Sequence, residues 1–250
     1  MIEALSCSIN TQNQKKYHFR GGRDMKLNHI YCGDCLEVMR GMEDNSVDLI
    51  LTDPPYKLEN HGGGKSKMWR QLCDKHIDFI SNGFTENILP ELERVCKVVN
   101  IILFCSNKQV SKLMGFFERK DYSTTLLVWH KPNAVPFGNG KYVSDIEYLI
   151  YIRGKNATYN NEIKERSKLF SYNYPSTSER VHPTQKPIAL IDKLLQIHSK
   201  SNDIILDPFL GSGTTCVAAK ELGRRYIGIE ISQKYVDIAN KRLSQGVLPF

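Results

Sequence analysis

The sequence predicts an α/β protein with a doubly wound, mostly parallel sheet. From residue 29 onward, short strand-like segments alternate with segments of helical period, as in chains whose parallel strands are joined by helices. Two strand candidates, 47–52 (VDLILT) and 101–105 (IILFC), are almost continuously apolar. Such strands are typical of a parallel sheet that helices cover on both faces.

The expected elements follow one another in a regular order. They are strand 29–32, helix 36–42, strand 47–52, helix 85–99, strand 101–105, helix 108–118, strands 124–130 and 146–152, helix 187–198, strand 204–206, helix 214–222, strand 226–229 and helix 232–243. In the helix over 85–99, apolar residues recur every three or four positions, which is the period of one helix face. Pro187 suits the start of its helix, and Ser232 is a good N-terminal cap.

The composition is that of a folded globular protein. The chain has 250 residues, of which 41% are hydrophobic and 24% charged, so disorder is not the dominant state. It contains no run of 18 apolar residues and no apolar block in its first 24 residues, so we expect neither a membrane span nor a signal peptide. Seven cysteines, an odd number in a chain of this size, indicate a reducing, cytosolic protein.

We expect one domain over 27–250, preceded by an N-terminal extension over 1–26 that is flexible or bound to a partner. The formal charge of the chain is +7, and it is concentrated in three stretches. Residues 1–26 and 57–75 each carry +3 and residues 153–186 carry +4, so the rest of the chain is slightly acidic. Local basic loops suit a polyanionic partner such as nucleic acid, and equally an ordinary solvated surface.

A turn with two glycines follows the buried strand 204–206. The segment Asp207–Thr214 (DPFLGSGT) opens a helix, and its glycines would let the backbone approach a ligand at the free N–H groups of the helix end. Glu230 ends the next strand, about 20 positions later, where an acidic residue suits ribose hydroxyls. Glycine pairs also form tight turns without a ligand, and the three-glycine fingerprint is absent. Together, these features predict an adenosine-type cofactor.

A second motif, Asp53-Pro54-Pro55-Tyr56, follows the buried strand 47–52. The two prolines hold the backbone extended and remove N–H donors. The Asp53 carboxylate and the Pro54 carbonyl then offer two acceptors, which suit an exocyclic amine with its two hydrogens, and Tyr56 offers a flat face for a base. The alternative is a strand end stiffened by proline, without a ligand.

The two motifs together resemble the S-adenosylmethionine-dependent amino-DNA methyltransferases. Because the tetrapeptide precedes the cofactor turn, the chain is similar to their permuted β group. Three further segments resemble motifs of that group: 33–37 (GDCLE), 129–133 (WHKPN) and 182–187 (HPTQKP). The match covers about residues 27–245 and implies a Rossmann-like methyltransferase fold with a small inserted target-recognition region. One departure is Asn100, where a glycine is common.

The resemblance assigns roles to individual residues. It implies that the tetrapeptide Asp53, Pro54, Pro55 and Tyr56 is catalytic. Asp34 would meet the adenine of S-adenosylmethionine, Glu230 its ribose, and Thr184 with Lys186 its methionine end. The cofactor turn would line the methionine part through Asp207, Pro208, Phe209, Gly211, Ser212, Gly213 and Thr214.

The resemblance also implies that the partner is double-stranded DNA. The target base would be flipped out of the duplex, and the sequence would be recognised by residues 153–181 and by the loop at 57–75. Candidate DNA contacts are the basic residues Lys57, Lys65, Lys67, Arg70, Lys164, Arg166, Lys168 and Arg180. A homodimer and a cognate restriction endonuclease remain open, and we expect a cytoplasmic, nucleoid-associated protein of bacterial or phage origin.

The expected reaction is methyl transfer to the N6 of adenine in DNA. Family members that act on cytosine more often carry serine in place of Asp53, so cytosine N4 is the alternative, followed by RNA or a protein amide. A non-catalytic nucleic-acid-binding module on the same fold is a further alternative. Cytosine C5 chemistry is disfavoured, because the enzymes of that class carry their nucleophilic cysteine directly after a proline and no cysteine here has that position.

A zinc site is the remaining alternative. Cys32 and Cys35 form a C-x-x-C pair, and Cys73 with His76 forms a C-x-x-H pair, which together would suit tetrahedral zinc. The two pairs are separated by a buried strand and by the tetrapeptide. We therefore expect no metal.

Overall fold

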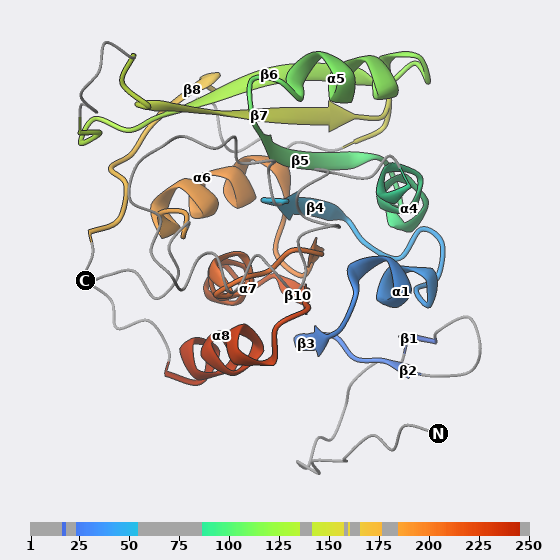
Figure 1. The fold of residues 1–250 in the computed structure, drawn as a ribbon. Coiled ribbons are helices and arrows are strands. Elements are labelled where there is room, and N and C mark those ends of the chain that lie inside the picture. The colour runs from blue at the N-terminus through green and yellow to red at the C-terminus, as the bar shows by residue number, and fades with distance from the viewer. Residues whose placement is uncertain are drawn as a thin grey trace.

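The central feature is an eight-stranded sheet in the order β3-β10-β9-β4-β5-β7-β6-β8 (Figure 1). The computed structural model describes residues 17–18, 24–54, 87–135, 142–157, 160, 166–176 and 185–245. In sheet order, the strands are His29–Cys32, Arg225–Glu230, Ile204–Asp207, Leu49–Thr52, Asn100–Cys105, Ile146–Arg153, Ser123–His130 and Leu169–Ser171. Only β7 runs antiparallel to its neighbours, β5 and β6, so the expected mostly parallel sheet is confirmed.

Helices pack on both faces of the sheet. The helices α1 (Cys35–Arg40), α4 (Ile88–Val95) and α5 (Val110–Glu118) contribute to the core on one face. The helices α6 (Ile188–His198), α7 (Thr214–Glu221) and α8 (Gln233–Gln245) contribute to the core on the other (Figure 1). The fold is therefore doubly wound, as the strand and helix alternation predicts.

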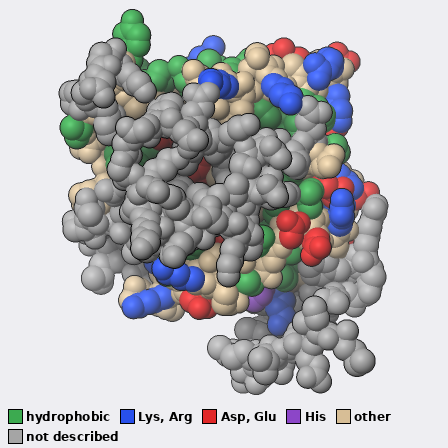
Figure 2. Space-filling view, in the orientation of Figure 1, with side chains coloured by type: hydrophobic (Ala, Val, Ile, Leu, Met, Phe, Trp, Pro, Cys, Tyr) green, Lys and Arg blue, Asp and Glu red, His purple; other side chains and the backbone are tan. Residues whose placement is uncertain are grey.

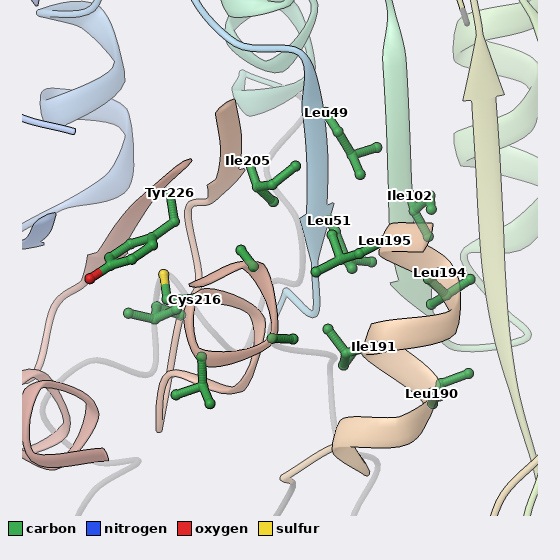
Figure 3. Close-up of a cluster of buried hydrophobic side chains, with 14 of the residues drawn as sticks. Leu49, Leu51, Ile102, Leu190, Ile191, Leu194, Leu195, Ile205, Cys216 and Tyr226 are labelled. Atoms are coloured by element: carbon green, nitrogen blue, oxygen red, sulfur yellow. The ribbon is translucent and has the colours of Figure 1, made fainter. Parts of the chain in front are cut away.

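The continuous apolar strands are explained by burial on both faces. In β4, Leu49 and Leu51 point to the core beneath α6 and α7, whereas Ile50 points to the core beneath α1 and α4. Figure 3 shows Leu49 and Leu51 on the same side as Leu195 of α6. Successive side chains of a strand alternate between its two faces, and both faces are buried here. Every residue of this strand must therefore be apolar or have a hydrogen-bond partner for its polar group.

The structure refines the expected boundaries and adds one strand. The helix expected over 85–99 ends at Val95, because Cys96 is extended and Val47 pairs with it in an isolated bridge; residues 85–86 lie outside the described part. The strand β8 (Leu169–Ser171) lies within residues 153–181, where no strand was predicted. It is three residues long and pairs with β6 at the edge of the sheet, so its pattern was too short to recognise.

A second, two-stranded sheet joins β1 (Tyr17–His18) to β2 (Asp24–Met25). Met25 and Leu27 are buried in the core beneath α1. The chain is therefore anchored to the main domain from Met25 onward. Within the described residues, no helix combines the length and the apolar character needed to cross a bilayer.

Candidate active site

The two sequence motifs meet where β4 and β9 lie side by side. Both strands end at the same edge of the sheet, with Leu49 opposite Ile205 and Ile50 opposite Leu206. The helix after β9 is α7, and the next described helix after β4 is α4, on the opposite face. In an open α/β sheet, ligands bind beyond the carboxyl ends of two strands that are arranged in this way.

A buried hydrogen bond joins the two strand ends directly. Thr52, the last residue of β4, donates from Oγ1 to Oδ1 of Asp207 over 2.7 Å. The same oxygen accepts the backbone N–H of Phe209 at 3.1 Å. Burial raises the pKa of Asp207 to about 6, and hydrogen bonds from Thr52 and Thr215 oppose that rise. Asp207 therefore ties the cofactor turn to the strand that carries the tetrapeptide.

The cofactor turn is held in an unusual backbone conformation. Gly211 and Gly213 have φ values of 55° and 90°, which favour glycine. A Cβ atom added at Gly213 would lie 2.7 Å from Cβ of Ala239 in α8, so the close packing of this helix also requires glycine. Within the turn, Pro208, Ser212 and Thr214 are buried and Phe209 is half-buried.

The helix α8 holds the same turn through Arg242. The Nη1 group of Arg242 donates to the backbone oxygen of Ser212 at 2.7 Å. It also lies 3.2 Å from the hydroxyl oxygens of Ser212 and Thr214. Arg242 was not predicted as a site residue, because an arginine in the last helix of the chain carries no motif that links it to a turn about 30 residues earlier.

Glu230 lies at the end of β10, as expected, and faces the turn. Its Oε2 accepts the N–H of Gly211 and its Oε1 accepts the N–H of Ser232, each at 2.8 Å. Burial raises its pKa, and these backbone hydrogen bonds oppose the rise. A carboxylate has about four acceptor positions, so capacity remains for ligand hydroxyls.

Asp34 lies beside Glu230 at the next strand. The backbone N–H of Gly33 donates to the backbone oxygen of Glu230 at 3.0 Å, which brings the residues after β3 to the same edge. Asp34 is the N-terminal cap of α1, where its Oδ1 accepts the N–H of Glu37 at 3.0 Å. The structure thus gives Asp34 a capping role in addition to the predicted contact with a cofactor.

An adenosine-type cofactor fits the groups at this edge. A Cβ atom added at Gly211 would meet nothing within 4 Å, so the backbone is open to a ligand there. Among the described residues, no side chain caps the N-terminus of α7, which leaves its first N–H groups available. Together with the acceptor capacity of Glu230, these groups suit the hydroxyl, amine and carboxylate groups of a nucleoside linked to an amino acid.

The catalytic candidate Asp53 directly follows β4 and is paired with Lys186. The Nζ atom of Lys186 contacts Oδ2 of Asp53 and lies 3.3 Å from Oε2 of Glu147. The Lys186 side chain is only 8% exposed. Burial lowers its pKa, but Asp53 and Glu147 more than compensate, so the pKa of Lys186 is raised and the ammonium stays charged. The resemblance assigns Lys186 to the methionine end of the cofactor, and in the structure its ammonium contacts the carboxylate of the catalytic candidate Asp53.

The motif at 129–133 organises the segment that follows β8. Trp129 donates from Nε1 to the backbone oxygen of Tyr172 at 2.8 Å. Asn133 exchanges two hydrogen bonds with the backbone of Tyr174, at 2.9 and 2.8 Å. Lys131 turns instead toward Glu147, with Nζ 3.2 Å from Oε1. This motif therefore attaches the 172–174 segment to the sheet and contributes a cation near the site.

Several predicted residues lie outside the described part of the chain. They are Pro55, Tyr56, Lys57, Lys65, Lys67, Arg70, Lys164, Arg180 and Thr184. Pro54 is described and buried, and Arg166 and Lys168 are exposed just before β8.

The zinc alternative gains no support from the described residues. Cys32 is exposed whereas Cys35 is buried, and Cys73 and His76 are not described. In the described ranges, no three His, Cys, Asp or Glu side chains are grouped so that they could hold a metal ion.

The fold and the paired motifs define an amino-DNA methyltransferase. The chain belongs to the N6/N4 DNA methylase family, since the model of this family, described as DNA methylase, matches residues 47–241. The matched region contains Asp53, the whole cofactor turn and Glu230.

Known members and solved structures agree with this assignment. The chain is 34% identical to the type II methyltransferase M.HinfI of Haemophilus influenzae, over 88% of this chain and 69% of that protein. It is 29% identical to the type II methyltransferase M.HpaI of Haemophilus parainfluenzae, over 86% and 73%. The crystal structure of an M1.HpyAVI–SAM complex is 31% identical, with a TM-score of 0.67 over 86% of this chain and 98% of that one.

A more distant structure shares the fold alone. The PvuII DNA methyltransferase, described as cytosine-N4-specific, is 15% identical, with a TM-score of 0.64 over 85% of each chain. The same fold therefore occurs in a cytosine-specific enzyme, so the fold does not identify the target base.

Proposed function

We propose that this protein transfers a methyl group from S-adenosylmethionine to the N6 atom of adenine in duplex DNA. The observation that carries the proposal is the hydrogen bond between Thr52 and Asp207, which lies between the tetrapeptide and the cofactor turn. Asp53 follows Thr52 directly, so the start of the tetrapeptide lies beside the turn that would carry the methyl donor. Adenine is favoured over cytosine because the first residue of the tetrapeptide is an aspartate.

The residues around the turn would hold the cofactor. Glu230 would accept the ribose hydroxyls, and Asp34 would lie near the adenine. The backbone around Gly211 and Gly213 would receive the methionine part, together with Thr184. When bound, S-adenosylmethionine supplies a sulfonium methyl group that is already activated for transfer.

The protein then has to orient the acceptor amine. Adenine N6 is a weak nucleophile because its lone pair is delocalised into the ring. Hydrogen bonds from the amine to the Asp53 carboxylate and the Pro54 carbonyl would return electron density to the nitrogen. The nearby negative charge would also stabilise the positive charge that develops on the amine. Catalysis would then consist of positioning and electrostatic stabilisation, without a covalent intermediate.

The target base must leave the duplex before it can reach Asp53. Extrusion costs a few kcal/mol, and stacking on Tyr56 would offset part of this cost. Arg166 and Lys168, together with the basic residues of 57–75, would contact the DNA backbone. Residues 153–181 would recognise the sequence, and β8 would connect this region to the edge of the sheet. A homodimer and a cognate endonuclease remain predictions of the family resemblance.

The test is methyl transfer from labelled S-adenosylmethionine to unmethylated duplex DNA of mixed sequence. The DNA is digested to nucleosides, and the labelled product is identified by chromatography. We expect N6-methyladenine. Labelled N4-methylcytosine would show that the target base is cytosine, which would be methylated by the same mechanism. Binding of the cofactor without label in any nucleoside would contradict the proposed function, and parallel reactions with RNA would test the nearest alternative substrate.

A further inference from the structure

Four charged side chains form a continuous chain across the carboxyl edge of the sheet. Lys131 contacts Glu147, Glu147 contacts Lys186, and Lys186 contacts Asp53. They come from the ends of β6, β7 and β4 and from the residue before Pro187, which is the N-cap of α6. The sheet order β4-β5-β7-β6 places these strands next to one another. Lysines and carboxylates alternate, so the four charges sum to zero.

These four charged side chains are largely shielded from water. The side chains of Lys186 and Lys131 are 8% and 10% exposed, and those of Asp53 and Glu147 are 24% and 26% exposed. The Oε2 atom of Glu147, which faces Lys186, is itself buried. A buried ammonium group is unfavourable unless carboxylates compensate it. Glu147 compensates two such groups at once.

The aromatic ring of Phe104 provides a third contact for the Lys186 ammonium. Nζ lies 4.9 Å from the centre of this ring, which comes from β5, between β4 and β7. The ammonium thus has Asp53 on one side, Glu147 on another and an aromatic face beneath it. A lysine side chain is long and flexible, so these three contacts determine where the charge lies.

We infer that Glu147 is a positioning residue of methyl transfer, which acts by holding the Lys186 ammonium against the Asp53 carboxylate. This inference rests on the proposed role of Asp53 as the acceptor of the target amine. The ammonium orients the carboxylate, and Glu147 contacts the ammonium from another side and offsets one of the two positive charges of Lys186 and Lys131. Glu147 belongs to none of the sequence motifs of this chain.

The charge count explains why Glu147 matters for the reaction rather than only for folding. Without Glu147, the site holds two ammonium groups and one carboxylate, with a net charge of +1. The target amine becomes positively charged as the methyl group arrives, so a net positive site opposes the transition state more than the bound substrate. The loss of Glu147 should therefore reduce kcat more than it weakens binding of either substrate.

The experiment compares the intact protein with Glu147→Gln, and total methyl transfer to DNA is measured. We expect kcat to fall about 10- to 100-fold. The KM for DNA and the Kd for S-adenosylmethionine should stay within about twofold. The alkaline limb of the kcat–pH profile should move to lower pH, because Lys186 loses one of the two carboxylates that raise its pKa. Glu147→Asp should recover part of the rate.

Glu93→Gln is the matched control. The Glu93 side chain in α4 is 24% exposed, close to the 26% of Glu147, and it pairs with Lys120, whose side chain is 40% exposed. This variant therefore removes a carboxylate of similar exposure from an ion pair away from the site. Both variants should lower the melting temperature, but only Glu147→Gln should lower kcat. An unchanged kcat, or a loss of kcat that merely follows a loss of stability or of cofactor affinity, would overturn the inference.

A double variant distinguishes two possible roles of Glu147, which are to position the Lys186 ammonium and to neutralise the charge of Lys131. Lys131→Met combined with Glu147→Gln restores the net charge but leaves Lys186 without its second partner. We expect this double variant to regain the part of the rate that the net charge accounts for, but to stay slower than the intact protein because Lys186 is no longer held by Glu147. Recovery to the rate of the intact protein would overturn the inference. Failure of the proposed function is seen separately, because the intact protein would then yield a labelled product other than N6-methyladenine.

Discussion

At the scale of single residues, Asp53 and Asp207 are carboxylates placed in different environments. Asp207 is fully enclosed and accepts hydrogen bonds from Thr52 and Phe209. Asp53 is partly exposed and has a lysine as its partner. This difference suits a structural role for Asp207 at the cofactor turn and a role for Asp53 toward a substrate that enters from solvent.

Replacing Asp53 tests this division of roles. We expect Asp53→Ala and Asp53→Asn to lower kcat by about 1,000-fold or more, because the target amine loses its charged acceptor. Cofactor affinity, measured by titration calorimetry, should change less than about threefold. Asp48→Asn is the control, since Asp48 precedes the same strand at its other end and pairs with Lys97. Loss of cofactor binding in the Asp53 variants would contradict the assignment.

At the scale of elements, α8 supports the cofactor turn from behind. Ala239 packs against Gly213, and Arg242 donates to Ser212 and lies close to the hydroxyl of Thr214. A turn that is held in its binding conformation binds its ligand without an ordering cost. We therefore expect the last helix of the chain to support the predicted cofactor turn.

The contribution of α8 can be measured with Arg242→Met, which keeps much of the aliphatic stem. We expect the Kd for S-adenosylmethionine to rise about tenfold, because the loss of charge-assisted hydrogen bonds worth roughly 1.5 kcal/mol loosens the turn. Lys241→Met, at the exposed neighbouring position, should leave the Kd unchanged. Equal effects of the two variants would show that Arg242 acts only through the general charge of the helix.

The packing of α6 against α7 predicts a dependence of stability on pH. Burial, with a smaller effect of Glu221, raises the pKa of Asp192 to about 6 from an ordinary value of 3.8. Among the described residues, its Oδ1 atom has no hydrogen-bond partner. The folded state therefore binds more protons than the unfolded state between about pH 4 and 6, and this group lowers stability as the pH rises through that range.

Asp192→Asn should remove this penalty. At pH 7.5 we expect the variant to be more stable by about 1 kcal/mol, a value reduced for solvent screening because the group is half-exposed. The advantage should vanish toward pH 4, where the wild-type carboxyl is protonated. Urea unfolding at both pH values measures the difference. The exposed Asp237→Asn variant should show no such trend, and a pH-independent gain at position 192 would refute the explanation.

At the scale of the whole molecule, the net positive charge is concentrated in three stretches of the sequence. On the face shown in Figure 2, the described Lys and Arg side chains are scattered, with Asp and Glu between them. The excess positive charge lies in the stretches 1–26, 57–75 and 153–186. A nucleic acid would therefore be attracted to these segments rather than to the helices that cover the sheet.

This distribution predicts a strong dependence of DNA binding on salt. Between 50 and 200 mM salt, we expect the KM for DNA to rise at least about tenfold because counterions are released from the phosphates. The Kd for the cofactor should stay nearly constant. Arg166→Gln and Lys168→Gln should each lower the slope of log K against log salt by about 1. Lys200→Gln, an exposed position after α6, should not change it.

The fold class and the main elements could be predicted from the sequence. Hydrophobic period is a short-range property, so the strands at 29–32 and 101–105 and the helix after Pro187 follow from neighbouring residues alone. The structure confirms all three within one or two residues. The short edge strand Leu169–Ser171 was missed because three residues carry no detectable period, and its pairing with β6 depends on a distant segment.

The sequence by itself determined where the motifs stand: Asp53 after one buried strand, Asp207 after another and Glu230 after a third. Only the tertiary structure decided which side chains meet. Thr52 and Asp207 are 155 positions apart, and Asp53 and Lys186 are 133 apart. The first contact exists because β4 pairs with β9, and the second because the residue before the N-cap of α6 lies at the same edge of the sheet. Strand order depends on long-range packing of both faces, which no local pattern encodes.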